Sequence, residues 1–302
     1  MRFAEAVRAI DEAAEFADLV TAAAPLEDGR TAAASVDPVD AYRKLSKIVH
    51  PDAAPAALSA TATRAFAKLS ALWANRAATC LASGDIADLL AADGGDAVLK
   101  VPRSLADNDL MAVEAAALRT LWTDGDPRYR AYAPRLIESA TRADGRVVNK
   151  LKRLHGFVSL DGMNRIDPRD AAWIWRRLLV ALGWAHRAGL VHGAVLPAHV
   201  LIHPTEHGVV LVDWCYAVRP GNRLAALVAE HRADYPPEIP HVTPATDIYL
   251  ATVLMRRLMH NPPKPIARFI SGCLYDAPRM RPQDVWALLA ELDELLENLR
   301  LR

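Results

Sequence analysis

The sequence predicts an α+β chain, mainly helical, in which a helical front module precedes a larger part of mixed helices and strands. Three observations lead to this prediction. The first 80 residues carry apolar side chains at helical spacing. From about Gly84 onward, short β-branched runs such as AVLKVPR (97–103) occur between helical segments. The chain has 302 residues, 52% of them hydrophobic, which is enough for two domains that each bury a core.

Composition limits the environment and the partners. Basic and acidic residues number 36 each, so no long-range field attracts nucleic acid or an acidic membrane, and we expect neither as a partner. The three cysteines are far apart and odd in number, which favours a reducing cytoplasm over a disulfide framework. The N-terminus lacks the apolar core of a signal peptide, and the most apolar stretch (173–196) is interrupted by arginines and histidines. We therefore expect a cytoplasmic chain without a membrane span.

The front module is predicted to contain three helices. The first is amphipathic and covers residues 3–20. The second starts at Asp37-Pro38, an acceptor cap followed by a first-turn proline, and ends at His50, because Pro51 disfavours helical geometry in the residue before it. The third covers roughly Thr61 to Cys80. The expected inward side chains are Phe3, Val7, Ile10, Ala14, Leu19, Tyr42, Leu45, Val49, Phe66, Leu69, Leu72 and Trp73.

The string YRKLSKIVHPD (42–52), followed by AFAKLSALW (65–73), resembles the J domain of DnaJ-type co-chaperones and defines a module over residues 1–80. In that family the His-Pro-Asp tripeptide and the basic helix dock on a DnaK-type chaperone and stimulate its ATP hydrolysis. The resemblance implies contact roles for His50, Pro51 and Asp52, and electrostatic roles for Arg43, Lys44 and Lys47. The loop after Asp52 is alanine-rich instead of lysine-rich, which implies weaker docking. An ordinary helical hairpin with a solvated basic face is the alternative.

The rest of the chain shows a definite order of elements. A strand at 97–103 is followed by a helix capped by Asp107 or Asn108, and later by a long helix that ends at Gly189. Strands at 200–203 and 209–212 then flank the turn PTEHG.

This order resembles the protein kinase fold over residues 84–302, with an N-lobe at about 84–155 and a C-lobe at about 156–302. Six features carry the resemblance: a strand lysine followed by a helix glutamate, a helix of the form L-x-x-A-H-x-x-G-L-V-H (182–192), an aspartate after a hairpin, YPPE (235–238), TDIYLATVLMRRLM (246–259) and RMRPQDVWALL (279–289). The resemblance implies nucleotide-binding positions at Lys100, Glu114, Asp213 and His199, with Asp213 on magnesium. It also implies structural positions at His192, Glu238, Asp247 and Arg281, with Arg281 paired to Glu238.

The departures from the kinase pattern predict a pseudokinase, which is not an enzyme. Ala194 stands at the catalytic aspartate and has no acceptor for a proton, and Leu196 stands at the lysine. His199 replaces the asparagine that holds the second magnesium, and imidazole is a poor ligand for that hard cation. No G-x-G-x-x-G precedes the strand, and Trp214-Cys215 follow Asp213. Losing base, cation and metal ligand together removes several powers of ten in rate.

Two further patterns leave alternatives open. One pattern is the retained trio Lys100, Glu114 and Asp213. These residues either bind ATP with magnesium without turnover, or Lys100 and Glu114 form an ion pair with a structural role only. The histidines at 192, 199, 203 and 207 are either a zinc or nickel site or structural and surface residues, and no cysteine pair supports a metal. The segment 122–136 mixes aromatics and arginines and is expected to be a loop between a helix and a strand.

Three functions remain open on the sequence. The first is an adaptor co-chaperone that recruits a DnaK-type ATPase while the kinase-like domain binds a client. The second is an atypical ATP-dependent phosphotransferase. The third is a pure interaction scaffold. The intact tripeptide at 50–52 favours the first over the third, and Ala194 with Leu196 favours it over the second.

Overall fold

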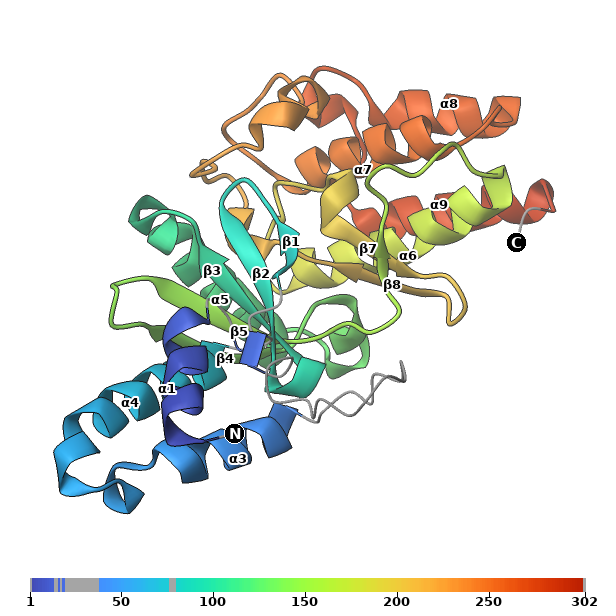
Figure 1. Cartoon of the computed structure of the whole chain (residues 1–302). Coiled ribbons are helices and arrows are strands. Elements are labelled where there is room, and N and C mark those ends of the chain that lie inside the picture. Colours follow the sequence, from blue (N-terminus) through green and yellow to red (C-terminus); the bar gives the residue numbers. More distant parts are fainter. Residues whose placement is uncertain (1, 14–15, 17, 20–37, 76–79, 301–302) are drawn as a thin grey trace. The chain divides into compact units, whose positions relative to one another are not determined.

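The computed structural model describes residues 2–13, 16, 18–19, 38–75 and 80–300 (Figure 1). Its helices and sheets confirm the predicted α+β class. The chain divides into two compact units. The first unit comprises residues 1–81 and 90–95, and the second comprises residues 82–89 and 96–302.

The first unit contains helices α1 (Phe3–Glu12), α3 (Pro38–Val49) and α4 (Ser59–Asn75). Apolar residues at helical spacing bring one face of each helix into a shared buried cluster. The cluster members on these helices are Ala6, Ile10, Ala41, Leu45, Val49, Ala65, Leu69 and Leu72. The rings of Tyr42 and Trp73 stack with centroids 4.3 Å apart, which ties α3 to α4.

Two predicted helix boundaries in this unit are wrong. The helix expected over residues 3–20 ends at Glu12, because Ala13 has an extended backbone (φ −65°, ψ 130°). The helix expected to reach Cys80 has its end at Asn75, and Cys80 instead begins a strand. Pairing with a neighbouring strand outweighs the weak helix preference of that residue. The expected core position Ala14 and the expected cap Asp37 lie outside the described residues.

A five-stranded sheet has the order β1-β2-β3-β5-β4. The strands are β1 (Cys80–Ser83), β2 (Ala87–Ala92), β3 (Ala97–Pro102), β4 (Leu136–Thr141) and β5 (Val147–Lys152). Helix α5 (Asn108–Thr123) follows β3 and packs against β4 and β5. Strands β3 and β5 are antiparallel, with Lys100 directly opposite Asn149. This register places two polar side chains on the same face of the sheet.

The remainder of the second unit is mostly helical. Figure 1 shows its helices gathered in one group, with the β7–β8 hairpin beside α6. The elements are α6 (Pro168–Arg187), α7 (Pro244–Leu258), α8 (Lys264–Cys273), α9 (Val285–Asn298), β6 (Val158–Ser159), β7 (Val200–His203) and β8 (Gly208–Leu211). Three fully buried indoles, those of Trp175, Trp184 and Trp214, are among the largest side chains of its core.

Several predicted elements of this part are confirmed. Strand β7 spans the predicted residues, and β8 lies one residue earlier than predicted. The long helix ends where Gly189 adopts a left-handed conformation (φ 79°), a common way to terminate a helix. The segment 124–135 connects α5 to β4, as expected for 122–136. Within the described ranges, every helix is too short or too polar to cross a lipid bilayer.

Candidate functional site

Lys100 joins two carboxylates inside the second unit. Its Nζ donates to Glu114 Oε1 at 2.9 Å and also to Asp213 Oδ1, although 113 residues separate Lys100 from Asp213. The side chains of Lys100 and Glu114 are 4% and 1% exposed, whereas that of Asp213 is 30% exposed. The structure therefore brings Lys100, Glu114 and Asp213 of the predicted nucleotide site into one ion cluster, and of these three side chains only Asp213 retains appreciable contact with solvent.

The charges of this cluster support one another. Burial opposes the charge on Lys100, but Asp213 and Glu114 outweigh that effect and raise the pKa of Lys100 well above its ordinary value. Burial likewise opposes the charge on Asp213, and the neighbouring Lys100 outweighs it and lowers the pKa of Asp213. The third neighbour of Lys100 Nζ is Cys215 Sγ at 3.8 Å, and burial raises the pKa of that thiol. Lysine and aspartate consequently remain ionised over the physiological range.

Asn149 is a member of this site that the sequence analysis missed. Its Nδ2 donates to Glu114 Oε2 and to the Met111 carbonyl oxygen, both at 2.9 Å. The side chain is fully buried, and its Oδ1 has no hydrogen-bond partner among the described residues. Asn149 thus fixes the carboxylate of Glu114 from strand β5 while Lys100 holds it from β3. The only signal in the sequence was an asparagine in an otherwise apolar and basic strand, VVNKLK (147–152).

The turn after β8 presents Asp213 to the cluster. Asp213 has left-handed backbone angles (φ 61°, ψ 49°), which a non-glycine residue adopts at some energetic cost. The following residue, Trp214, is fully buried, and its indole Nε1 donates to the Leu211 carbonyl oxygen at 2.8 Å. The large anchored indole therefore holds the turn, where the kinase pattern has Phe-Gly after the aspartate.

In the same unit, the Asp247 carboxylate holds the segment that begins at His192. Its carboxylate accepts the backbone N–H groups of His192 and Gly193, each at 2.8 Å, and contacts His186 Nε2 at 2.8 Å. His192 accepts the Ala194 N–H through Nδ1 (3.2 Å) and donates from Nε2 to the Val212 carbonyl oxygen (2.9 Å). Burial of this neutral ring lowers the pKa of His192 to about 4. Asp247 and His192 act here as a buried framework.

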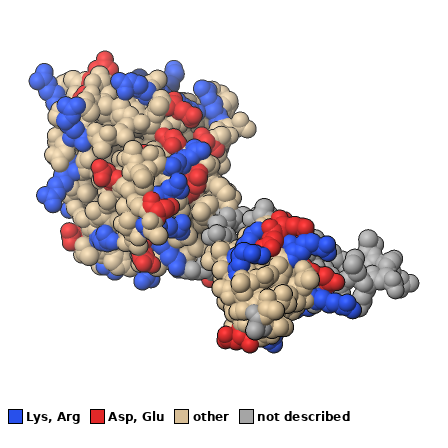
Figure 2. Space-filling model, turned by 60° about the vertical axis from the view of Figure 1, so that its left-hand side comes forward, with Lys and Arg blue, Asp and Glu red and all other residues tan. Residues whose placement is uncertain are grey.

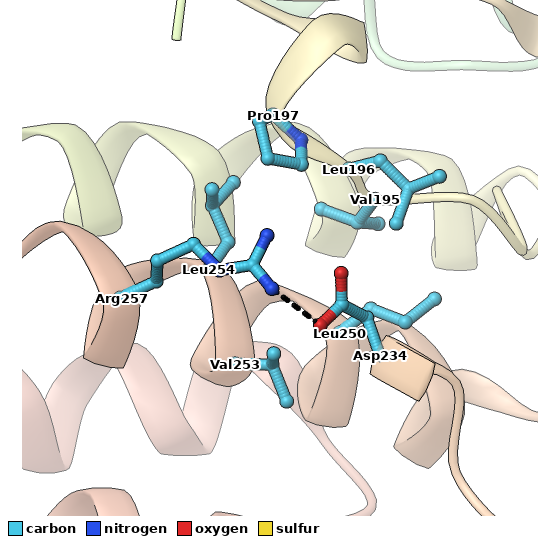
Figure 3. A pocket seen from close by; sticks show the side chains of 8 residues that line it. All are labelled: Val195, Leu196, Pro197, Asp234, Leu250, Val253, Leu254 and Arg257. Atoms are coloured by element: carbon cyan, nitrogen blue, oxygen red, sulfur yellow. Dashed lines mark hydrogen bonds and ion pairs between the residues drawn. The ribbon is translucent and has the colours of Figure 1, made fainter. Parts of the chain in front are cut away.

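Ala194 and Leu196 are buried, at 0% and 2% exposure. Figure 3 shows Val195, Leu196 and Pro197 facing α7 across a small hollow, where Arg257 donates to Asp234 at 2.7 Å. The hollow measures about 10 Å³, room for about one water molecule. Leu196 therefore serves as an apolar contact to α7, and position 194 has a buried methyl group where the kinase pattern has a carboxylate.

His199 joins the cluster from the other side. Its Nδ1 lies 2.7 Å from the Ala194 carbonyl oxygen, and its Nε2 lies 3.5 Å from Asp213 Oδ2. Both oxygens of Asp213 thus face cationic or imidazole nitrogens. Magnesium requires oxygen ligands, so the donors gathered here do not fit the magnesium site that the resemblance implies.

The four histidines do not form a common site. His203 bonds within its turn to Thr205 and Glu206, and His207 lies edge-on to the Trp173 ring with centroids 5.2 Å apart. His192 and His199 lie close together, with ring centroids 6.2 Å apart. In the portion of the chain that the structure describes, no three histidine, cysteine or acidic side chains converge as metal ligands would.

The predicted ion pair between Glu238 and Arg281 is present and is bidentate, with N···O distances of 2.6 and 3.0 Å. Arg281 is 3% exposed and also donates to the carbonyl oxygens of Tyr275 and Asp276. Its guanidinium lies over the Tyr249 ring, 4.5 Å from the centroid. This network fixes the segment around Glu238 to α7 and to the turn before α9.

In the first unit, the His50-Pro51-Asp52 loop lies directly after α3. The Asp52 side chain is 91% exposed and that of His50 is 46% exposed. His50 Nδ1 accepts the Asp52 N–H at 3.3 Å, and the His50 ring packs edge-on against Phe66 of α4. Arg43, Lys44 and Lys47 are all exposed on α3. The loop is therefore held in shape while its carboxylate remains accessible.

Comparison with known proteins gives limited information. No protein-family model matches the chain. A stretch of 45 residues is 40% identical to casein kinase II subunit alpha' of Saccharomyces cerevisiae. The match covers 15% of this chain and 13% of the yeast protein, so it is a local similarity to a protein kinase and does not establish a family.

Proposed function

We propose that the chain is an adaptor co-chaperone. Its J-domain-like first unit recruits a DnaK-type chaperone and stimulates ATP hydrolysis by that chaperone, while the kinase-like second unit binds a client protein. The observation that carries the proposal is the accessible Asp52 carboxylate in an ordered His-Pro-Asp loop next to an exposed basic helix. The basic residues 43, 44 and 47 would speed encounter with an acidic partner surface.

The contacts at positions 194, 196 and 199 support a second unit without phosphoryl transfer. A kinase needs a carboxylate base, a cation near the transferred group and oxygen ligands for magnesium. Ala194 and Leu196 are buried apolar residues, and His199 places imidazole beside Asp213. The Lys100–Glu114–Asp213 cluster would then stabilise the fold.

The chaperone role is tested by steady-state ATP hydrolysis of the cognate DnaK-type chaperone with the full chain added. The wild type should stimulate hydrolysis, and His50→Gln and Asp52→Asn should each return it to the basal rate. Asp52 makes no core contact, so its variant should fold as the wild type does. His155→Gln, an exposed histidine of the second unit, is the matched control and should keep full stimulation. Absence of stimulation by saturating wild-type protein would favour a pure interaction scaffold.

An atypical ATP-dependent phosphotransferase is the second candidate, favoured by the local similarity to a protein kinase and by the retained Lys100–Asp213 pair. Incubation of the purified protein with labelled ATP and magnesium or manganese distinguishes a phosphotransferase from an inactive adaptor. We expect no autophosphorylation. A signal in the wild type that disappears in Asp213→Ala would replace the pseudokinase proposal by this one.

A further inference from the structure

A surface at the end of α5 combines an exposed tryptophan with several basic side chains. Trp122 is 38% exposed. The Arg130 guanidinium lies 4.4 Å from the Trp122 ring centroid, and that of Arg135 lies 5.4 Å from it. Arg130 also donates from Nε and Nη2 to the Trp122 carbonyl oxygen, at 3.1 and 2.6 Å. The indole therefore lies at the surface in contact with two guanidinium groups.

Two more basic residues adjoin this group. Arg119 is exposed on α5, three residues before Trp122 and hence on the same side of the helix. Lys152 is exposed on β5, and its backbone N–H donates to the Arg135 carbonyl oxygen at 2.9 Å, so the two residues face each other across neighbouring chain segments. We refer to Arg119, Trp122, Arg130, Arg135 and Lys152 together as the Trp122 patch.

The described residues do not neutralise the cations of the Trp122 patch. No carboxylate of the described residues lies within ion-pair distance of its four basic side chains. By contrast, the nearby Arg128 is bound to Asp126 through both Nε and Nη2, at 3.1 and 2.6 Å. On the face seen in Figure 2, basic and acidic side chains lie among one another. The patch is thus a local positive site on a chain of zero net charge.

Apolar surface continues the patch on one side. Ile137 lies two residues after Arg135 at the start of β4 and is 49% exposed. Strand β4 stands at the end of the strand order, so it is an edge strand of its sheet. An extended segment of a partner could lie along this edge with carboxylates on the arginines and an apolar side chain on the indole.

We infer that the Trp122 patch binds an acidic, extended segment of a partner protein. Tryptophan and arginine are the residue types that contribute most at the centres of protein interfaces, and a guanidinium binds a carboxylate through two parallel hydrogen bonds. Single-stranded nucleic acid also uses cations and an aromatic platform, but it needs a basic groove that follows the backbone over several nucleotides. Four cations around one indole match a short acidic segment better.

This inference specifies the partner class for the client role proposed above. It rests on the proposed function only for the cellular role of the bound segment, which would be part of a client protein. Binding to the patch is measured without a chaperone, and stimulation of a chaperone is measured without the patch ligand. Either result can therefore fail while the other succeeds.

The test is fluorescence anisotropy of the full chain with a labelled glutamate peptide that carries a central Leu-Phe pair. The wild type should bind it saturably, and added salt should weaken binding. The double variant Arg119→Ala/Arg135→Ala should lower affinity at least about tenfold, since hydrogen bonds to charged groups are among the stronger ones. Trp122→Ala should separately lower affinity by at least about tenfold, since tryptophan is among the residues that contribute most at interface centres. Arg128→Ala, which removes an arginine already paired with Asp126, should leave affinity unchanged.

Three outcomes would overturn the inference. Equal binding of a peptide with glutamine in place of glutamate would exclude recognition of charge. Tighter binding of oligothymidylate of the same length would assign the patch to nucleic acid. Absence of saturable binding to the glutamate peptide, with circular dichroism confirming folded protein, would exclude the site.

Discussion

Lys100 and Asp213 have different roles in the second unit, although they form one ion pair. Lys100 is enclosed by Glu114, Asp213 and Cys215, so its three N–H groups all face protein atoms. Asp213 is the more exposed partner, and its second oxygen faces His199 Nε2 at 3.5 Å. Removing Lys100 would leave the buried Glu114 carboxylate without its cation, which is why such clusters persist even where no chemistry requires them.

In the proposed pseudokinase, His199 stands where the kinase pattern has an oxygen ligand, so we predict that magnesium does not bind beside Asp213. In thermal melts, magnesium chloride alone should leave the melting temperature of the wild type unchanged. The melting temperature with ATP and magnesium should equal the melting temperature with ATP and EDTA. His199→Asn, which restores an amide oxygen beside Asp213, should create a magnesium-dependent increase. His207→Asn is the matched control, because it lies on the hairpin turn with a left-handed backbone that asparagine tolerates. An equal magnesium response in the wild type and His199→Asn would contradict the assignment.

His192 predicts how stability depends on pH. Its ring is neutral and fully hydrogen-bonded in the native state, with a pKa lowered from 6.5 to about 4. The unfolded chain therefore binds a proton that the native ring does not. The neutral, buried His192 ring therefore contributes to the free energy of unfolding above about pH 6.5. Up to about 3 kcal/mol of this contribution is lost as the pH falls toward about 4.

Urea unfolding at about pH 7 and about pH 4.5 checks this dependence. The decrease in unfolding free energy should be smaller in His192→Gln than in the wild type. It should be unchanged in His260→Gln, which alters an exposed histidine. Equal decreases in the wild type and in His192→Gln would show that other groups cause the loss.

At the scale of elements, close helix packing explains the glycine inside α6. Gly183 is buried, and the Trp286 side chain of α9 comes so near that a Cβ atom at position 183 would lie 2.7 Å from the indole. A glycine usually weakens a helix, but here it permits a large ring of the neighbouring helix to fill the space. The contact between α6 and α9 is thus set by one small and one large residue.

Gly183→Ala should therefore lower the free energy of unfolding by about 1–3 kcal/mol through overpacking, despite the better helix propensity of alanine. Gly272→Ala in α8 is the matched control, because a Cβ there meets no atom within 4 Å. That variant should be neutral or gain up to about 1 kcal/mol. Urea unfolding of both variants measures the difference, and a stabilised Gly183→Ala would mean that α9 moves freely to accommodate the methyl group.

At the scale of the whole molecule, the proposed activities belong to separate units. The exposed loop at 50–52 belongs to the first unit, whereas the buried ion cluster and the Trp122 patch belong to the second. Neither proposed role requires the chain itself to transfer a phosphoryl group. The zero net charge fits this arrangement, since each binding surface depends on a local group of charges instead of the field of the whole protein.

The sequence by itself determined the features that depend on neighbours along the chain. Pro51 ends α3 at Val49, Gly189 ends the long helix, and the turn at 204–207 separates β7 from β8. The ion pair of Glu238 with Arg281 was also predictable, but only through resemblance to a family. These signals are local because proline, glycine and turn residues restrict their own backbone angles.

Only the tertiary structure decided the features that join distant residues. The alanine-rich β1 and β2 have little strand propensity and become strands by pairing. In the sequence, Asn149 looks like an ordinary strand residue. Its role becomes apparent only in the fold, where β5 packs against α5 and Asn149 donates a hydrogen bond to Glu114. Arg135 reaches Trp122 only after the loop folds back on α5. Strand pairing, burial and charge compensation join residues that are far apart in the sequence, so the spacing of residues along the chain does not predict them.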